Sequence, residues 1–314
     1  MIPRSASILA LAVLAPAFAS AQVPSPSPSP SPFTVGVDVN VVSVTAVVFD
    51  KAGRFIKGLG PSDVEVVEDG VKQDVSYFRE AGKGEDKIPL SVILVLDASG
   101  SMKKNMRFLQ EAANTFVHKL EEVDQALVVQ FNESVKGSLE FTNDAERLEQ
   151  FVEALQAWGG TSLYDAIHYA LGRIKDQAGR KALVVFSDGD DTTSTMKEQE
   201  VVDYARAVEA TIYSVGIEGG GMGGGSPRGF LKRIAGETGG TYFFPDKLGD
   251  LIKAFAEISE ELHNHYLLAY SPKRPPDGTF RTITVRLKRK DAEVRVRKGY
   301  FAAKRRRPPT KPAS

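Results

Sequence analysis

Apolar runs alternate with amphipathic stretches through the middle of the chain. The first run, Val92–Leu96, is uninterrupted, too short to span a membrane and bounded by turn residues, so it predicts a strand buried on both faces. Apolar residues at helical spacing follow it, at Met106, Leu109, Ala113, Phe116, Val117 and Leu120. Further runs at Ala126–Phe131, Ala182–Phe186 and Ile212–Ile217 each come after a helical stretch. This alternation predicts an α/β domain over residues 89–263, with a doubly wound, mostly parallel sheet covered on both faces.

Strand patterns of period two flank this domain on both sides. Residues 36–86 carry alternating valines and turn residues, which predict about four short strands, including a hairpin that runs into Val75–Phe78. Residues 265–301 return to the same pattern, beginning with a strand at Tyr266–Tyr270. Neither set is long enough to bury a good core alone, and insertion between neighbouring strands is tolerated. We therefore expect both sets to form one β sandwich into which the α/β domain is inserted.

Both ends of the chain have the composition of non-globular segments. Residues 1–21 have a charged start, a short apolar core and a small-residue cleavage site, which predict a signal peptide cleaved after Ala21. The apolar core is shorter than the ~20 residues of a membrane span, so no transmembrane segment is expected after cleavage. Residues 22–35 predict a Pro/Ser-rich linker, and residues 302–314 a basic disordered tail. The mature protein is expected in the periplasm, outside the cell or at the cell surface.

Composition excludes several classes of function. The 40 Lys and Arg balance the 40 Asp and Glu, so the overall charge does not suggest a nucleic-acid partner. The absence of cysteine excludes disulfides, thiolate catalysis and thiolate metal sites. Basic residues are dense on the last strands, where we expect a solvated strand face, with an acidic polymer as the weaker alternative. These residues are Arg281, Arg286, Lys288, Arg289, Lys290, Arg295, Arg297 and Lys298.

Oxygen-bearing side chains stand at three loop edges of the predicted α/β domain. Asp97, Ser99 and Ser101 follow the first buried strand, Thr161 precedes a predicted helix, and Asp188 follows the strand that contains the third apolar run. Ligands of open α/β sheets sit outside the carboxyl ends of the strands, so these groups can converge there. A set of hydroxyls and carboxylates without Cys or His suits Mg²⁺, Mn²⁺ or Ca²⁺. For any one motif the alternative is that the carboxylate merely caps a helix or loop.

Taken together, the three motifs resemble a known metal site. D-x-S-x-S at 97–101, G-G-T at 159–161 and S-D-G at 187–189 are similar, in order and separation, to the metal-ion-dependent adhesion site of von Willebrand factor type A domains. The resemblance covers about residues 89–263. It implies a divalent-cation-dependent module that binds a protein or an extracellular-matrix or envelope ligand, in which an exposed Asp or Glu of the partner fills the last coordination position.

The resemblance also implies a role for each candidate ligand. Ser99, Ser101 and Thr161 would approach the ion through their hydroxyls, whereas Asp97 and Asp188 would hold it directly or through water. Mg²⁺ is the expected ion, with Mn²⁺ or Ca²⁺ as alternatives. Because the hydroxyls carry no charge, the ion remains electrophilic toward an outside carboxylate.

The flanking strands carry a second resemblance. Residues 48–59, 63–73 and 297–301 are similar to a bacterial subgroup of exported von Willebrand A-related proteins that is abundant in acidobacteria. This similarity informs the architecture and says almost nothing about the partner.

Two other functions remain open. A Mg²⁺-dependent hydrolase of the haloacid dehalogenase type would carry a second Asp where Ser99 stands, and the chain lacks a G-x-S-x-G elbow and a Walker A sequence, so no enzymatic activity is expected. The other is a structural or assembly subunit of an exported complex, with the metal only stabilising it. His263 and His265 could hold a transition metal but lack an evident third ligand. His118 and His168 are expected at surface or core positions of helices.

Overall fold

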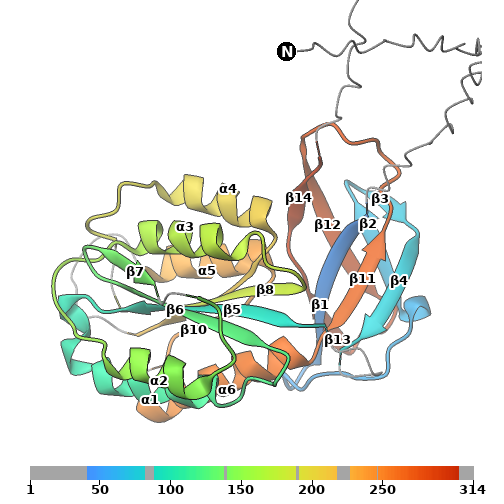
Figure 1. Cartoon of the computed structure of the whole chain (residues 1–314). Helices are drawn as coiled ribbons and strands as arrows, with labels where there is room; N and C mark the ends of the chain where they lie inside the picture. The colour runs from blue at the N-terminus through green and yellow to red at the C-terminus, as the bar shows by residue number, and fades with distance from the viewer. Residues whose placement is uncertain are drawn as a thin grey trace, which may run out of the picture. The chain divides into compact units, whose positions relative to one another are not determined.

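Three β-sheets organise the chain, and the central sheet carries helices on both faces (Figure 1). The computed structural model describes residues 41–81, 88–137, 140–188, 191–217, 227–245 and 247–303. The predicted signal peptide, linker and almost all of the predicted tail lie outside these residues. The described residues all belong to one compact unit. No helix in the described residues is long and apolar enough to cross a membrane.

The central sheet has six strands in the order β10-β9-β8-β5-β6-β7. Its members are β5 (Leu90–Asp97), β6 (Gln125–Phe131), β7 (Val135–Gly137), β8 (Arg180–Ser187), β9 (Thr211–Gly216) and β10 (Tyr242–Phe243). All neighbours pair in parallel except the edge strand β7, which is antiparallel to β6. Every residue of β5 is buried, as expected for a strand covered on both faces.

Helices cover both faces of this sheet through their apolar sides (Figure 1). On one face lie α1 (Met106–Val117), α2 (Ala145–Glu153) and α6 (Leu248–His263). On the other lie α3 (Leu163–Ile174), α4 (Glu198–Val208) and α5 (Pro227–Thr238). A short 3-10 helix, η2 (Gly100–Lys104), connects β5 to α1. The predicted doubly wound architecture is confirmed.

The other two sheets are antiparallel and four-stranded, in the orders β13-β1-β11-β4 and β14-β12-β2-β3. Their strands are β1 (Val42–Asp50), β2 (Val64–Glu68), β3 (Val71–Gln73), β4 (Val75–Glu80), β11 (Tyr266–Tyr270), β12 (Phe280–Leu287), β13 (Ala292–Arg295) and β14 (Gly299–Phe301), with the 3-10 turn η1 (Pro61–Asp63) before β2. Both sheets contribute to one apolar core. Each sheet combines strands from the two flanks, so the predicted sandwich around an inserted α/β domain is confirmed.

The structure differs from the predicted hairpin in one respect. Its return strand is β3, which pairs with β2 through Val66 and Gln73. The following strand, β4, leaves this sheet and pairs with β11 in the other one. The hydrophobic pattern cannot distinguish these partners, because both strands alternate in the same way and the partner of β4 lies almost 200 residues later.

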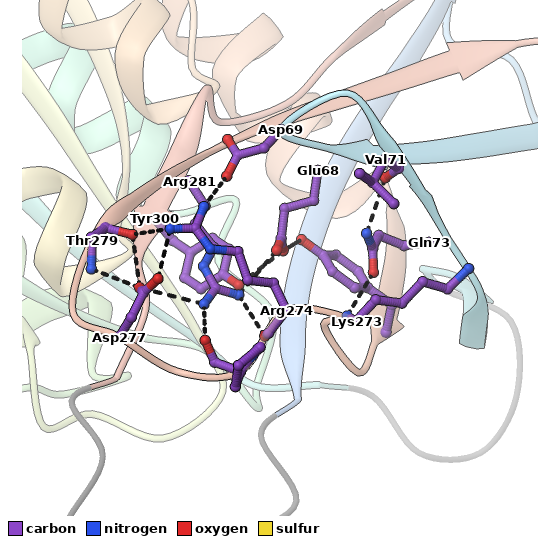
Figure 2. A network of polar contacts seen from close by, with 12 residues as sticks. Glu68, Asp69, Val71, Gln73, Lys273, Arg274, Asp277, Thr279, Arg281 and Tyr300 are labelled. Carbon is purple, nitrogen blue, oxygen red and sulfur yellow. Dashed lines mark hydrogen bonds and ion pairs between the residues drawn. The ribbon is translucent and has the colours of Figure 1, made fainter.

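The prediction of a solvated basic face is wrong at Arg281. This side chain is fully buried (0% exposed), because it shares the inward face of β12 with Ile283 and Val285. Arg281 Nη1 lies 3.1 Å from Oε1 of Glu68, which is itself 2% exposed. Tyr270 and Tyr300 donate to Glu68 Oε2 at 2.7 and 2.9 Å. Figure 2 shows this network, which also reaches the loop around Asp277.

The remaining basic residues divide into two groups. Those at and after the end of β12 are exposed, as expected: Arg286, Lys288, Arg289 and Lys290. Those from β13 onward instead form ion pairs with the α/β domain: Arg295 with Glu261, Arg297 with Glu209 (2.8 Å) and Lys298 with Glu237 (2.9 Å). The second group therefore joins the sandwich to the inserted domain.

Candidate metal centre

The carboxylate of Asp97 stands at the end of β5 and is completely buried. The Ser99 amide donates to its Oδ1 at 2.8 Å, and the Ser187 hydroxyl donates to its Oδ2 at 2.5 Å. Ser187 is the last residue of β8, the neighbour of β5 in the sheet. Both carboxylate oxygens are thus held by donors from two adjacent strand ends.

A chain of hydroxyl oxygens extends from this point to Asp188. Ser99 Oγ lies 3.0 Å from Ser101 Oγ, and Ser101 Oγ donates to Asp188 Oδ1 at 2.8 Å. Ser99 is 1% exposed and Asp188 is 3% exposed. The structure therefore brings four of the five predicted ligands together at the carboxyl ends of β5 and β8.

Thr161, the fifth predicted ligand, lies in a loop that is fixed to the same edge by its backbone. The Trp158 amide donates to Ala98 O, and the Gly100 amide donates to Gly159 O, each at 3.0 Å. Thr161 itself is 5% exposed, and its amide donates to Thr192 Oγ1 at 2.9 Å. In the described structure its hydroxyl makes no hydrogen bond to the other four residues, so only its loop connects it to them.

Two glycines allow this loop to pack so closely. Gly159 has φ +72°, a left-handed conformation that favours glycine, and a Cβ there would lie 2.9 Å from Glu133 Oε2. At Gly160 a Cβ would meet Thr193 Cγ2 at 2.8 Å. The first glycine permits the turn and the second permits the contact with the loop after β8.

The electrostatics of the site favour a cation. Burial, helped to a smaller extent by the nearby charge of Asp188, raises the pKa of Asp97 to about 6, although the hydrogen bonds from Ser187 and Ser99 act to lower it. Burial also raises the pKa of Asp188. Among the described residues, no Lys, Arg or His forms an ion pair with either carboxylate. Two buried acids without a positive partner, surrounded by hydroxyl oxygens, fit a hard divalent ion such as Mg²⁺.

The histidines do not form a metal site in the described structure. His263 uses both ring nitrogens, with Nδ1 2.6 Å from Ser259 O and Nε2 3.0 Å from Asp124 Oδ2. His265 is 4% exposed in the interior. Within the described ranges there is no group of three or more His, Cys, Asp or Glu arranged to hold a metal. The candidate centre has only two carboxylates, which is why hydroxyls are essential to it.

The sequence alone assigned no role to two residues of this region. Ser187 donates a hydrogen bond to Asp97. The sequence feature that could have indicated this role is its position at the end of β8, directly before Asp188. Trp158 is 47% exposed beside Gly159, and it is the only tryptophan in the chain. A single exposed aromatic residue in a loop gives no pattern in the sequence.

These features define a class: a doubly wound α/β domain with a candidate oxygen-ligand cation site at the carboxyl edge of its sheet. The model of the von Willebrand factor type A domain matches residues 91–257, just over half of the chain. The chain belongs to the von Willebrand factor type A domain family.

Known proteins are similar to this chain over most of its length. Inter-alpha-trypsin inhibitor heavy chain H2 of Mus musculus is 26% identical over 226 residues, which cover 65% of this chain and 23% of that protein. An uncharacterized protein of Synechocystis sp. is 25% identical over 213 residues, or 62% of this chain and 48% of that protein. The match thus spans about a quarter of the length of the heavy chain.

The fold is also similar to solved structures. A von Willebrand factor type A protein from Catenulispora acidiphila superposes with a TM-score of 0.50 at 16% identity, covering 74% of this chain and 71% of that one. This likeness supports the fold. It covers a larger share of the chain than the α/β domain alone.

Proposed function

We propose that this chain is an exported, divalent-cation-dependent binding module that captures an acidic side chain of a protein partner. Asp97, Ser99, Ser101, Thr161 and Asp188 would hold the ion, with Mg²⁺ as the expected species. The observation that carries the proposal is the continuous set of oxygens from Ser99 through Ser101 to Asp188, beside the buried carboxylate of Asp97.

The protein's own groups perform two tasks in this proposal. Ser187 and the Ser99 amide orient the Asp97 carboxylate, and Ser101 orients that of Asp188. When bound, a hard cation supplies an electrophilic coordination position, and Mg²⁺ retains exchangeable waters there. Only two of the five protein ligands carry charge, so the ion would remain electrophilic, and a carboxylate of the partner is a favourable final ligand.

Trp158 adds a contact surface next to the proposed ion. Trp158 is 47% exposed, and its loop, which contains Gly159, is hydrogen-bonded to Ala98. Tryptophan is enriched among the residues that dominate binding energy at protein interfaces. A partner would therefore place an Asp or Glu on the metal and an apolar group against Trp158.

We assign residues 1–21 to a signal peptide, 22–35 to a linker, 36–86 and 265–301 to the sandwich, 89–263 to the binding domain, and 302–314 to a tail. The partner is a protein, matrix or envelope ligand met in the periplasm or outside the cell. The acidobacterial-type subgroup fits the segments at 48–59 and 63–73. We propose no enzymatic activity, because Ser99 stands where a hydrolase of the haloacid dehalogenase type would carry its second carboxylate.

The test is capture of partners from the envelope and medium of the source organism, with Mg²⁺ or EDTA. Wild type should retain a partner only with Mg²⁺, and Asp97→Ala should lose it while remaining folded. Asp176→Ala, a carboxylate that is 85% exposed on its side chain, is the matched control and should behave as wild type.

Other outcomes would assign another function. Capture that is insensitive to EDTA, together with a lower melting temperature for Asp97→Ala, would make the metal structural and the chain an assembly subunit. Turnover in a phosphoester screen that disappears in Asp97→Ala would make it a hydrolase. Absence of any EDTA-sensitive partner would overturn the proposed binding function.

A further inference from the structure

A second polar site lies at the end of the central sheet opposite the candidate metal centre. It is a cavity of about 300 Å³ where the first residues of β8 and β9 meet β1 and β11 of the sandwich. Asp97 stands at the carboxyl end of β5, whereas Arg180 opens the parallel neighbour β8, so the two sites occupy opposite edges. Several hydroxyls line the cavity, among them those of Ser43, Thr45, Thr211 and Thr238.

The charge of the lining is unbalanced. Three basic residues, Arg180, Lys181 and Arg297, face one acid, Glu209. Glu209 Oε1 is 2.8 Å from Arg297 Nη1 and is therefore already paired. Among the described residues, neither Arg180 nor Lys181 has a carboxylate within ion-pair distance. Neither cation thus has a direct ion-pair partner: Asp124 acts on Arg180, and Glu209 and Asp176 act on Lys181, only from a longer distance, and the Lys181 ammonium donates to Lys175 O at 3.2 Å.

One buried hydrogen-bond donor of the cavity lining also lacks a partner in the described structure. Arg297 is only 10% exposed on its side chain, and its Nε is buried without a hydrogen-bond partner, although Nη2 donates to Ser43 O at 2.7 Å. Arg180 donates from Nη1 to a backbone carbonyl, that of Leu262. Burial lowers the pKa of Arg180 to about 10 and also lowers that of Lys181. Burial therefore disfavours the positive forms of Arg180 and Lys181, and a bound anion would stabilise both.

We propose that this cavity binds a small tetrahedral oxyanion, either free phosphate or the phosphate group of a small metabolite. Guanidinium groups match the oxygens of phosphate in geometry as well as charge. The cations come from two directions, Arg180 and Lys181 from β8 and Arg297 from the segment after β13, and hydroxyls complete the wall. The volume accommodates phosphate with a short organic group, since it lies at the lower limit of small-molecule sites. The bound anion would join the sandwich to the inserted domain.

The experiment measures binding to the full mature chain by calorimetry and thermal unfolding. The probes are inorganic phosphate, glycerol 3-phosphate and acetate, each against NaCl at equal ionic strength. Phosphate should raise the melting temperature above the NaCl value, and acetate should not. Tighter binding of glycerol 3-phosphate than of phosphate would identify a phosphorylated metabolite as the source, and equal binding would identify the free ion.

Variants separate this site from general salt effects and from the metal. Lys181→Gln should weaken phosphate binding by about tenfold or more, as expected for loss of one charge-assisted bond. Lys175→Gln, at a half-exposed position outside the cavity, should bind as wild type. Arg180→Met should weaken binding further, and if it fails to fold, Lys181→Gln alone decides.

Two results would overturn the proposal. One is equal phosphate affinity in wild type and Lys181→Gln. The other is a phosphate effect that requires Mg²⁺ and vanishes in Asp97→Ala, since the anion would then bind at the metal centre. Because the cavity proposal does not depend on the metal, Asp97→Ala should otherwise retain the full response to phosphate.

Discussion

The Ser101 hydroxyl donates a 2.8 Å hydrogen bond to Asp188 across 87 residues of sequence. Sheet topology produces this contact, because β5 and β8 pair in parallel with Leu96 opposite Phe186. The residues that follow these partners therefore leave the sheet side by side. A site at this edge requires both strands to end at the same level, and the register ensures it.

Magnesium should stabilise the folded protein through this site. With free Mg²⁺ at 100-fold above its dissociation constant, the free energy of unfolding should rise by about 2.7 kcal/mol, and EDTA should reverse the gain. Asp188→Asn should abolish this gain. In EDTA the variant should be as stable as wild type or more so, because burial raises the pKa of both Asp97 and Asp188 and their charges repel. Urea unfolding with Mg²⁺ or EDTA measures both effects.

Asp176→Asn is the control for the magnesium experiment. This carboxylate is 85% exposed, so its removal should leave the Mg²⁺ response intact. Equal stabilisation of wild type and Asp188→Asn by Mg²⁺ would place the ion elsewhere. The emission of Trp158, the only tryptophan, provides an independent titration beside the site.

A methyl group at Gly160 should displace the loop that carries Thr161. Its Cβ would lie 2.8 Å from Thr193 Cγ2, so Gly160→Ala should cost about 1–3 kcal/mol through overpacking and weaken Mg²⁺ binding. Gly236→Ala in α5 is the matched control, since a Cβ there has no atom within 4 Å, and it should stabilise by about 0.5–1 kcal/mol. Thermal unfolding and Mg²⁺ titration compare the two. A Gly160→Ala protein with unchanged Mg²⁺ affinity would show that the loop position does not matter.

The central sheet and the candidate metal residues could be predicted because their signals are local. Val92–Leu96 is apolar throughout, as a strand with two covered faces must be, and Asp97 follows it directly. The parallel arrangement then places Asp188 at the same edge of the sheet as Asp97, and the pairing of β8 with β5 brings the two together. Family matching strengthens this prediction, and the structure adds the hydrogen bond from Ser187 that holds the Asp97 carboxylate.

Contacts between distant segments could not be predicted in the same way. The alternation of β12 placed Arg281 on the same face as Ile283, but its buried position depends on Glu68, 213 residues earlier. Similarly, Arg297 becomes a cavity residue because it meets Glu209 and Ser43. A basic residue carries no sequence mark that distinguishes a solvated position from a buried pair.

The buried Glu68–Arg281 pair should be costly to break from one side. Arg281→Met leaves the Glu68 carboxylate uncompensated in the core and should destabilise the protein by about 3–5 kcal/mol. The double variant Glu68→Gln with Arg281→Met should recover much of this loss, because no buried charge remains. Chemical denaturation of the single and double variants measures the coupling.

The exposed pair of Arg289 and Asp291 provides the comparison. Its side chains are 41% and 64% exposed, so Arg289→Met should change stability by less than about 1 kcal/mol. Similar losses for Arg281→Met and Arg289→Met would contradict the assignment of Arg281 to the core.

His263, the last residue of α6, and His265, just after the helix, should make stability depend on pH in opposite ways. Burial lowers the pKa of His265 to about 2, so above pH 6.5 the ring is neutral in both folded and unfolded states. Below pH 6.5 only the unfolded state gains the proton, and stability should fall by about 1.4 kcal/mol at pH 5.5. The hydrogen bond to Asp124 raises the pKa of His263, so its contribution is complete below pH 6.5 and is lost as pH rises through the raised value.

Substitution separates these two contributions. His265→Gln should remove the loss of stability between pH 7.5 and 5.5, whereas His263→Gln should deepen it by removing the opposing contribution. His118→Gln, at a ring that is 53% exposed, is the control and should follow the wild-type profile. Urea unfolding at both pH values measures the difference. If wild type and His265→Gln lost equal free energy on acidification, protonation of His265 would not limit stability in acid, and the profile would have to arise from carboxylates elsewhere in the chain.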